Sequence, residues 1–192
     1  MIDQGTLHDR TFSPLAEERA GALKCLSVKI ETLPKREEAV QDMLRLSSDK
    51  DSLVKESAIQ ALEQVFSCVS DKMRIWAALA ELATDSSLRV RQAAVQALTR
   101  VYIHVPGEQQ VWGDLLNLAG SDESSVREKA LPCLGRAFPT LPDKNLAWED
   151  LLTLAKAPER TVRKEAIKTL GTGFEYIEAR EQAPDLNPDL NP

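Results

Sequence analysis

Aromatic side chains, histidines and cysteines are scarce in this 192-residue chain. Aromatic residues make up 5% of it, and the two histidines are His8 and His104. The three cysteines, Cys25, Cys68 and Cys133, are an odd number without a CxxC pair, which predicts free thiols in a reducing compartment. An HExxH motif and a clustered His/Asp set are also missing, so we expect no metal centre and no cofactor.

Other absences exclude further classes of protein. Neither GxxxxGK[ST] nor GxGxxG occurs, which argues against nucleotide chemistry. The formal net charge of -6 does not favour a nucleic-acid binder, because such proteins usually carry a basic surface. No apolar run is long enough to span a membrane, and the first residues do not have the pattern of a signal peptide. We therefore expect a cytoplasmic protein that is not an enzyme and binds neither nucleic acid nor membranes.

One nine-residue sequence motif occurs four times at constant spacing. Its copies, VKESAIQAL, VRQAAVQAL, VREKALPCL and VRKEAIKTL, begin at Val54, Val90, Val126 and Val162, each 36 residues after the last. A second phrase keeps the same period and places a tryptophan at Trp76, Trp112 and Trp148. Such a register over most of the chain indicates a repeat protein.

The apolar residues of each copy recur at helical spacing. Val90, Ala94, Leu98 and Val101 lie on one helix face. A first helix is predicted over roughly residues 36–48 and a second over roughly 52–67, repeated every 36 residues. A single two-helix unit cannot bury its apolar face, so the units must stack on one another.

The sequence thus predicts an all-α protein, a right-handed α-solenoid of about five helical pairs. The repeat domain is expected over residues 1–176 and begins with a degenerate half unit, 1–12, in which Leu7 fits an apolar column. The predicted units are 13–33, 36–69, 72–105, 108–141 and 144–176. Residues 177–192 are expected to be an extended or disordered acidic tail that contains proline.

Local signals add details to this scheme. Ser125 followed by Glu128 predicts a capping box at the start of a helix. Pro132 lies within a predicted helix and should kink it. Gly171 and Gly173 should make the end of the last helix fray.

The phrase D-S-S-x-x-V-R-x-x-A-x-x-A-L, from Asp85 to Leu98, and its copies resemble HEAT repeats, including the HEAT-like repeats of phycobilisome lyases. The resemblance covers about residues 14–176 and implies the solenoid fold. It also implies a ladder of Asp–Arg pairs between neighbouring units, and we interpret the basic column in this way. That column consists of Arg19, Lys55, Arg91, Arg127 and Arg163.

Two further columns are interpreted as structural. The recurring tryptophans are read as packing residues, because a single ligand site does not need a residue repeated in every unit. The outer face of the first helices is acidic and is read as a solvated surface. Its residues are Glu37, Glu38, Asp42, Glu81, Asp114, Glu149 and Asp150.

The outward stripe of the second helices is the candidate site, since in HEAT-like solenoids these helices line the concave side. We predict a non-catalytic scaffold that binds a partner protein or peptide there, although a glutamine-rich surface also fits plain solubility. The candidate residues are Gln60, Gln64, Gln92, Gln96, Arg100, Arg136, Lys164 and Lys168.

Several alternatives stay open. The chain could be a sensor array detached from a signalling NTPase, or a lyase-like chaperone for a tetrapyrrole-carrying protein. It is expected to be a monomer, or to self-associate weakly through its tail or the solenoid ends. The acidic DLNPDLNP segment could also lie in the basic half of the groove, while a tail that touches nothing is the simpler expectation.

Overall fold

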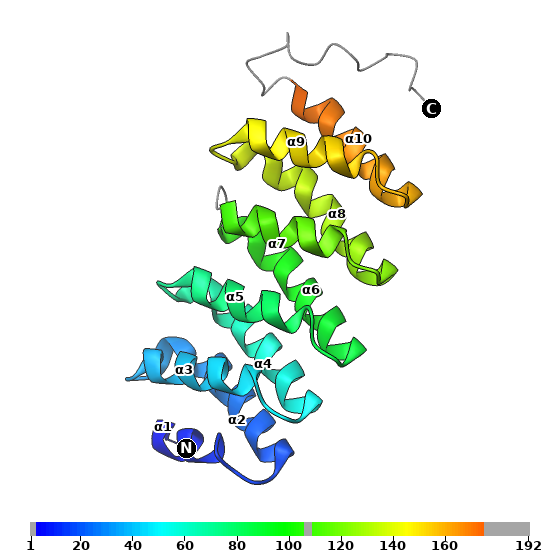
Figure 1. Cartoon of the computed structure of the whole chain (residues 1–192). Coiled ribbons are helices and arrows are strands. Elements are labelled where there is room, and N and C mark those ends of the chain that lie inside the picture. Colours follow the sequence, from blue (N-terminus) through cyan, green and yellow to red (C-terminus); the bar gives the residue numbers. More distant parts are fainter. Residues whose placement is uncertain (1–2, 106–108, 175–192) are drawn as a thin grey trace.

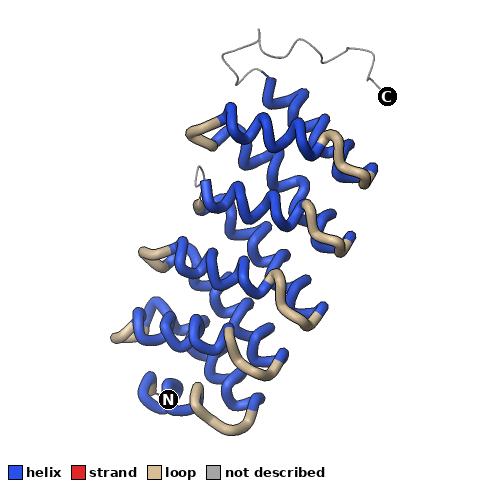
Figure 2. Tube along the Cα trace, viewed as in Figure 1, coloured by secondary structure: helices blue, strands red, loops and turns tan. Residues whose placement is uncertain are grey.

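The computed structural model describes residues 3–105 and 109–174, and this part of the chain is helical without a strand (Figure 2). The first helices of the units, called A helices here, are α1 (Gln4–Arg10), α3 (Arg36–Ser47), α5 (Lys72–Leu82), α7 (Gln109–Ala119) and α9 (Lys144–Leu154). The B helices are α2 (Ala16–Lys29), α4 (Ser52–Val65), α6 (Leu88–Val101), α8 (Ser124–Ala137) and α10 (Arg160–Gly173). Short 3-10 turns, η1 (Ile30–Thr32), η2 (Phe66–Cys68), η3 (Tyr102–His104) and η4 (Phe138–Thr140), follow the first four B helices.

The pairs stack in chain order and form two layers, with the A helices in one and the B helices in the other (Figure 1). Each B helix packs directly on the next, α2 on α4, α4 on α6, α6 on α8 and α8 on α10, whereas consecutive A helices contact each other far less. The predicted all-α solenoid is confirmed. The proposed tail, residues 177–192, lies outside the described residues.

Small residues allow this close approach of the B helices. Ala58, Ala94 and Ala130 have no exposed surface. Another small-residue column includes two of the cysteines, of which Cys133 is buried and Cys25 is half-buried. The tight B layer therefore depends on columns that the repeat keeps small.

The predicted capping box at Ser125 is wrong. Helix α8 begins at Ser124, two residues earlier than predicted, and its N-cap residue is Glu123, whose side chain makes no capping hydrogen bond. The Ser125 hydroxyl instead donates to the Glu123 carboxylate at 2.6 Å. Glu123 in turn accepts a hydrogen bond from Arg91 of the preceding unit, so a contact between units replaces the local cap.

The end of α10 approaches the preceding unit so closely that it needs a glycine. A Cβ atom added at Gly173 would lie 2.7 Å from the Phe138 ring. That ring has no room to move, because it is fully buried between Trp112 and Trp148, whose ring centroids are each 6.2 Å away. The expected fraying at this glycine stays a prediction, as does the kink at Pro132, which lies inside the assigned helix α8.

Two alanine substitutions should therefore have opposite effects. Gly173→Ala should lower the free energy of unfolding by about 1–3 kcal/mol, because the new methyl group clashes with a buried ring. Gly171→Ala should raise it by about 0.5–1 kcal/mol, since that exposed helix position has nothing within 4 Å of a new Cβ. Urea denaturation of the two variants measures both effects. Equal midpoints would contradict the close approach of α10 to Phe138.

Candidate interaction surface on the B helices

The basic column forms ion pairs between neighbouring units, called rungs here. Arg19 donates from Nε and Nη2 to the two carboxylate oxygens of Asp49, at 2.8 and 2.9 Å. Lys55 pairs with Asp85 of the next unit through a single contact from Nζ to one carboxylate oxygen. The ladder implied by the resemblance is confirmed for these first two rungs, whose cations hold neighbouring units together.

The third rung uses a different acid from the first two. Arg91 pairs with Glu123 at 2.9 Å, two residues beyond Ser121, which occupies the position of Asp49 and Asp85 in the repeat. Ser121 has no carboxylate, and the glutamate two residues later supplies one to the same arginine.

The ladder has no carboxylate beyond this rung within the described residues. Arg127 donates to the Ser121 carbonyl at 2.6 Å, but its Nε atom is buried without a described partner. Arg163 donates to the carbonyls of Ala157 and Pro158. Alanine at 157 takes the place that aspartate has in the first rungs, so the last units are held together without an ion pair of this kind.

Hydrogen bonds and charges hold the rung carboxylates ionised. Burial raises the pKa of Asp49, but the hydrogen bond and charge of Arg19 act against it and leave the pKa below its ordinary value. The hydrogen bond from the lysine of its rung lowers the pKa of Asp85. For Glu123, the Ser125 hydroxyl and then the arginine of its rung lower the pKa.

These directions predict acid sensitivity. A carboxylate whose pKa is depressed by folding contributes stability that is fully present above its unfolded pKa of about 4 and is lost as the pH falls through the lower folded value. Urea midpoints should therefore be constant near neutral pH and fall below about pH 4.5. The triple variant Asp49→Asn, Asp85→Asn, Glu123→Gln should be less stable at pH 7. Its urea midpoint should also fall less than that of the parent as the pH is lowered below about 4.5. Parallel pH curves for the two proteins would contradict a role for the rungs.

A second ladder connects the A helices. The indole N–H of Trp76 donates to Asp114, and that of Trp112 donates to Asp150, each at 2.8 Å. Both tryptophans are buried, which confirms their interpretation as packing residues. The prediction that Asp114 and Asp150 are merely solvated was wrong, because each accepts a hydrogen bond from the preceding unit.

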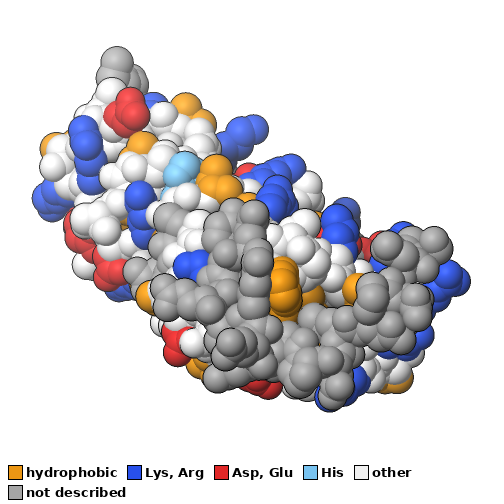
Figure 3. Space-filling model, turned by 90° about the horizontal axis from the view of Figure 1, so that it is seen from above, with side chains coloured by type: hydrophobic (Ala, Val, Ile, Leu, Met, Phe, Trp, Pro, Cys, Tyr) orange, Lys and Arg blue, Asp and Glu red, His pale blue; other side chains and the backbone are white. Residues whose placement is uncertain are grey.

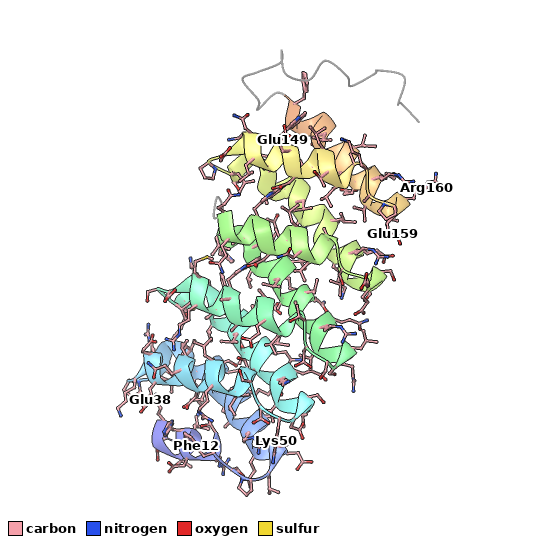
Figure 4. All side chains as sticks on the ribbon, viewed as in Figure 1. Phe12, Glu38, Lys50, Glu149, Glu159 and Arg160 are labelled. Atoms are coloured by element: carbon pink, nitrogen blue, oxygen red, sulfur yellow. The ribbon has the colours of Figure 1, made fainter. Side chains whose placement is uncertain are left out.

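Asp42 is likewise not a solvated surface residue. Its side chain is 6% exposed and pairs with His8 of α1 at 2.7 Å and with Arg45 at 3.1 Å. Sequence reasoning missed the role of His8, because the two residues are 34 positions apart and no local pattern joins them. Glu37, Glu81 and Glu149 are exposed, as expected for the outer face. Figure 4 marks Glu38 and Glu149 on this layer.

The candidate binding residues are exposed with one exception. Gln92 is half-buried and donates to Ser125 at 3.2 Å, so its assignment to an open surface was wrong. Four of the others also make intramolecular contacts: Gln64 accepts from Ser27, Arg100 pairs with Glu63, Lys168 pairs with Glu165, and Arg136 donates to the Cys133 sulfur. Arg136 lies over the Tyr102 ring, with its guanidinium carbon 5.2 Å from the centroid. The side chains of Gln60, Gln96 and Lys164 have no hydrogen bond or ion pair with other described residues.

Two positions, four residues apart, repeat along the B helices and form what we call the B-face lane. All ten of its side chains are exposed, and none of them is acidic, although the whole chain has a net charge of -6. The lane consists of Lys24, Val28, Gln60, Gln64, Gln96, Arg100, Pro132, Arg136, Lys168 and Thr172. Four cations and three glutamines thus share one continuous strip.

The rest of the described surface has fewer features that could form a binding site. A cleft of about 320 Å³ between α5 and α7 is lined by eight residues, among them Ala77, Ala80, Glu81 and Gln110. Among residues 3–105 and 109–174, no group of three or more His, Cys, Asp or Glu side chains is placed to hold a metal ion. Within the same residues, no helix combines the length and the hydropathy needed to cross a membrane.

The unit is recognisable by comparison with known families. Residues 75–105 match the family model of the HEAT repeat. They comprise most of α5, together with α6 and η3, which is nearly one complete helical pair. The 36-residue register places the other pairs of the solenoid in line with this HEAT unit. No curated protein matches the chain significantly.

Solved structures share the fold at low sequence identity. The crystal structure of Cex1p is 16% identical, with a TM-score of 0.70 over 96% of this chain and 37% of that one. A designed armadillo repeat protein in complex with the peptide (KR)4 is 16% identical, with a TM-score of 0.59 over 88% of this chain and 80% of that one. The Pds5–Scc1 complex gives 16% identity and a TM-score of 0.60, over 87% of this chain and 28% of that one. These likenesses show the α-solenoid fold.

Proposed function

We propose that this chain is a non-catalytic interaction module that binds an acidic, extended segment of a partner protein along the B-face lane. The observation that supports the proposal is the composition of the lane: ten exposed side chains, four of them cationic and none acidic. A strip of one sign on a protein of the opposite net charge favours an anionic partner.

The glutamines give the lane a second means of recognition. Gln60 and Gln96 repeat at the same position of neighbouring B helices, and both are exposed. A side-chain amide donates and accepts, so it can satisfy the N–H and C=O groups of an extended peptide. Closely packed B helices and looser A helices also fit a B layer on the inner side of the curve, where a peptide would make the most contacts.

The related structures support a peptide ligand but not its charge. The designed armadillo protein holds the basic peptide (KR)4, whereas the B-face lane carries positive charge. The charge of the lane therefore decides our choice of an acidic ligand. The alternative of a lyase-like chaperone stays a prediction, and a visible absorption spectrum of the purified protein tests it.

Fluorescence anisotropy with two labelled decapeptides tests the proposal, one alternating Glu and Ser and the other alternating Lys and Ser. We expect the Glu peptide to bind, and binding to weaken as salt is raised, because screening shortens the reach of the charges to about 8 Å at physiological ionic strength. The double variant Arg100→Gln with Arg136→Gln should lower affinity about ten-fold.

The matched control removes two cations that lie outside the lane, in the variant Lys50→Gln with Arg89→Gln. Both residues are exposed, and the loss of net charge is the same. Affinity for the Glu peptide should change less than about two-fold. Equal losses in the two double variants, or tighter binding of the Lys peptide, would overturn the proposal.

A further inference from the structure

The C-terminal end of the solenoid exposes a position that is buried in every other unit. In the column of Leu23, Ile59, Val95 and Leu131, each side chain is at most 4% exposed, because the next unit packs on it. In the last unit Ile167 occupies this column and is 43% exposed. Leu154 is half-buried as well, whereas its equivalents in the earlier units are buried. An apolar surface thus lies open at this end.

Within the described residues, two hydrogen-bond donors of the last unit, Trp148 and Arg163, lack the carboxylate partners that their equivalents in the first units have. Trp76 and Trp112 donate to an aspartate of the following unit, but Trp148 has no acceptor among the described residues. Arg163, like Arg127, donates only to backbone carbonyls of this part of the chain, while Arg19 and Arg91 also donate to carboxylates of the following unit. The C-terminal end of the solenoid is therefore complementary to a segment that contains apolar side chains and carboxylates.

The charge of the last helix favours the same partner. Helix α10 and its N-cap residue carry Arg160, Arg163, Lys164 and Lys168 against Glu159 and Glu165. Glu159 and Arg160 lie at the turn where the helix begins (Figure 4). The view onto this end shows exposed hydrophobic side chains near basic ones (Figure 3).

We propose that residues 175–192 of this chain dock on the C-terminal end of the solenoid and cap it. This segment follows directly after Phe174, and its 18 residues could extend to about 60 Å, so every part of the end is within reach. It contains Tyr176, Ile177, Leu186 and Leu190, and five carboxylates against one arginine. Repeat arrays need terminal elements that cover the apolar face of their last unit.

A second copy of the chain matches the end less well. If its N-terminal unit stacked on α10 in register, its positions equivalent to Asp42, Asp49 and Asp51 would face Trp148 and Arg163. Those positions, 36 residues earlier, are Thr6, Ser13 and Leu15, which offer no carboxylate. The tail supplies the carboxylates that a second copy lacks.

Acrylamide quenching of the full chain measures the docking. Trp76 and Trp112 are at most 1% exposed, so a change in quenching reports on Trp148. The tail variants Leu186→Ser with Leu190→Ser, and Asp185→Lys with Asp189→Lys, should each raise the quenching constant about two-fold. The control Asn187→Ser with Asn191→Ser changes neither apolar nor charged groups and should equal the parent.

A charge swap makes the test specific. Arg163→Glu alone should raise quenching, and adding Asp185→Lys with Asp189→Lys to it should bring quenching back toward the parent value. Identical quenching in the parent and both tail variants would overturn the proposal. Quenching that falls as protein concentration rises, with dimers in sedimentation velocity, would also overturn it and assign the end to a second copy. The lane variants Arg100→Gln and Arg136→Gln should leave quenching unchanged, so this result is independent of the proposed function.

Discussion

Ala94→Asp is expected to destabilise the protein by about 3–5 kcal/mol, enough to unfold most of it near physiological temperature. Ala94 has no exposed surface and lies in a small-residue column of the packed B layer. An aspartate there must either remain charged without a partner or take up a proton, and it also overfills a tightly packed position. Chemical denaturation, or loss of the helical circular dichroism signal at 37 °C, measures the effect.

The control introduces the same residue two positions later. Gln96 is exposed on the B-face lane, and its side chain makes no hydrogen bond with other described residues. Gln96→Asp should therefore change the free energy of unfolding by about 0.5 kcal/mol or less. Gln92 does not serve as a control, because it already bonds to Ser125 and lies beside Glu123. Similar unfolding curves for Ala94→Asp and Gln96→Asp would contradict the arrangement of the B helices.

Trp112→Ala should cost about 3–5 kcal/mol, because it removes a fully buried indole and leaves a cavity between two units. Trp112→Phe keeps most of the packing but removes the donor to Asp150, and should cost about 1–2 kcal/mol. Urea denaturation gives both values. A loss below about 1 kcal/mol for the alanine variant would show that the tryptophan column does not support the core.

The same variants separate packing from ligand binding. If the column is structural, Trp112→Phe should bind the Glu peptide as the parent does, because Trp112 lies in the A layer, away from the B-face lane. Lost peptide binding in a folded Trp112→Phe protein would instead make the tryptophans part of a ligand site.

The repeat itself was predictable from sequence because every unit faces the same physical requirement. Each helical pair must bury one face against its neighbours, so Val90, Ala94 and Leu98 recur in every copy with the spacing of a helix. The tryptophan column followed from the same reasoning. The lane could be predicted in part, since Gln96 and Arg100 point away from the apolar columns, but Gln92 could not be placed, because its exposure depends on a neighbouring unit.

The partners of polar groups were decided only by the stacked structure. Trp112 and Asp150 are 38 residues apart and belong to different units, so their hydrogen bond exists only once the A helices stack. The same is true of His8 and Asp42. It is also true of Glu123, because no local pattern distinguishes it from other acids as the partner of Arg91.

The sequence by itself determined which residues face the core, because burial of an apolar face follows from helical spacing along one segment. It did not determine how the array ends. Ile167 fits the core column of its helix as well as Ile59 does, yet it is exposed where Ile59 is buried. Only the tertiary structure decides this difference, because the burial of a residue in a solenoid depends on whether another element packs on its unit, and helical spacing within the unit carries no information about that neighbour.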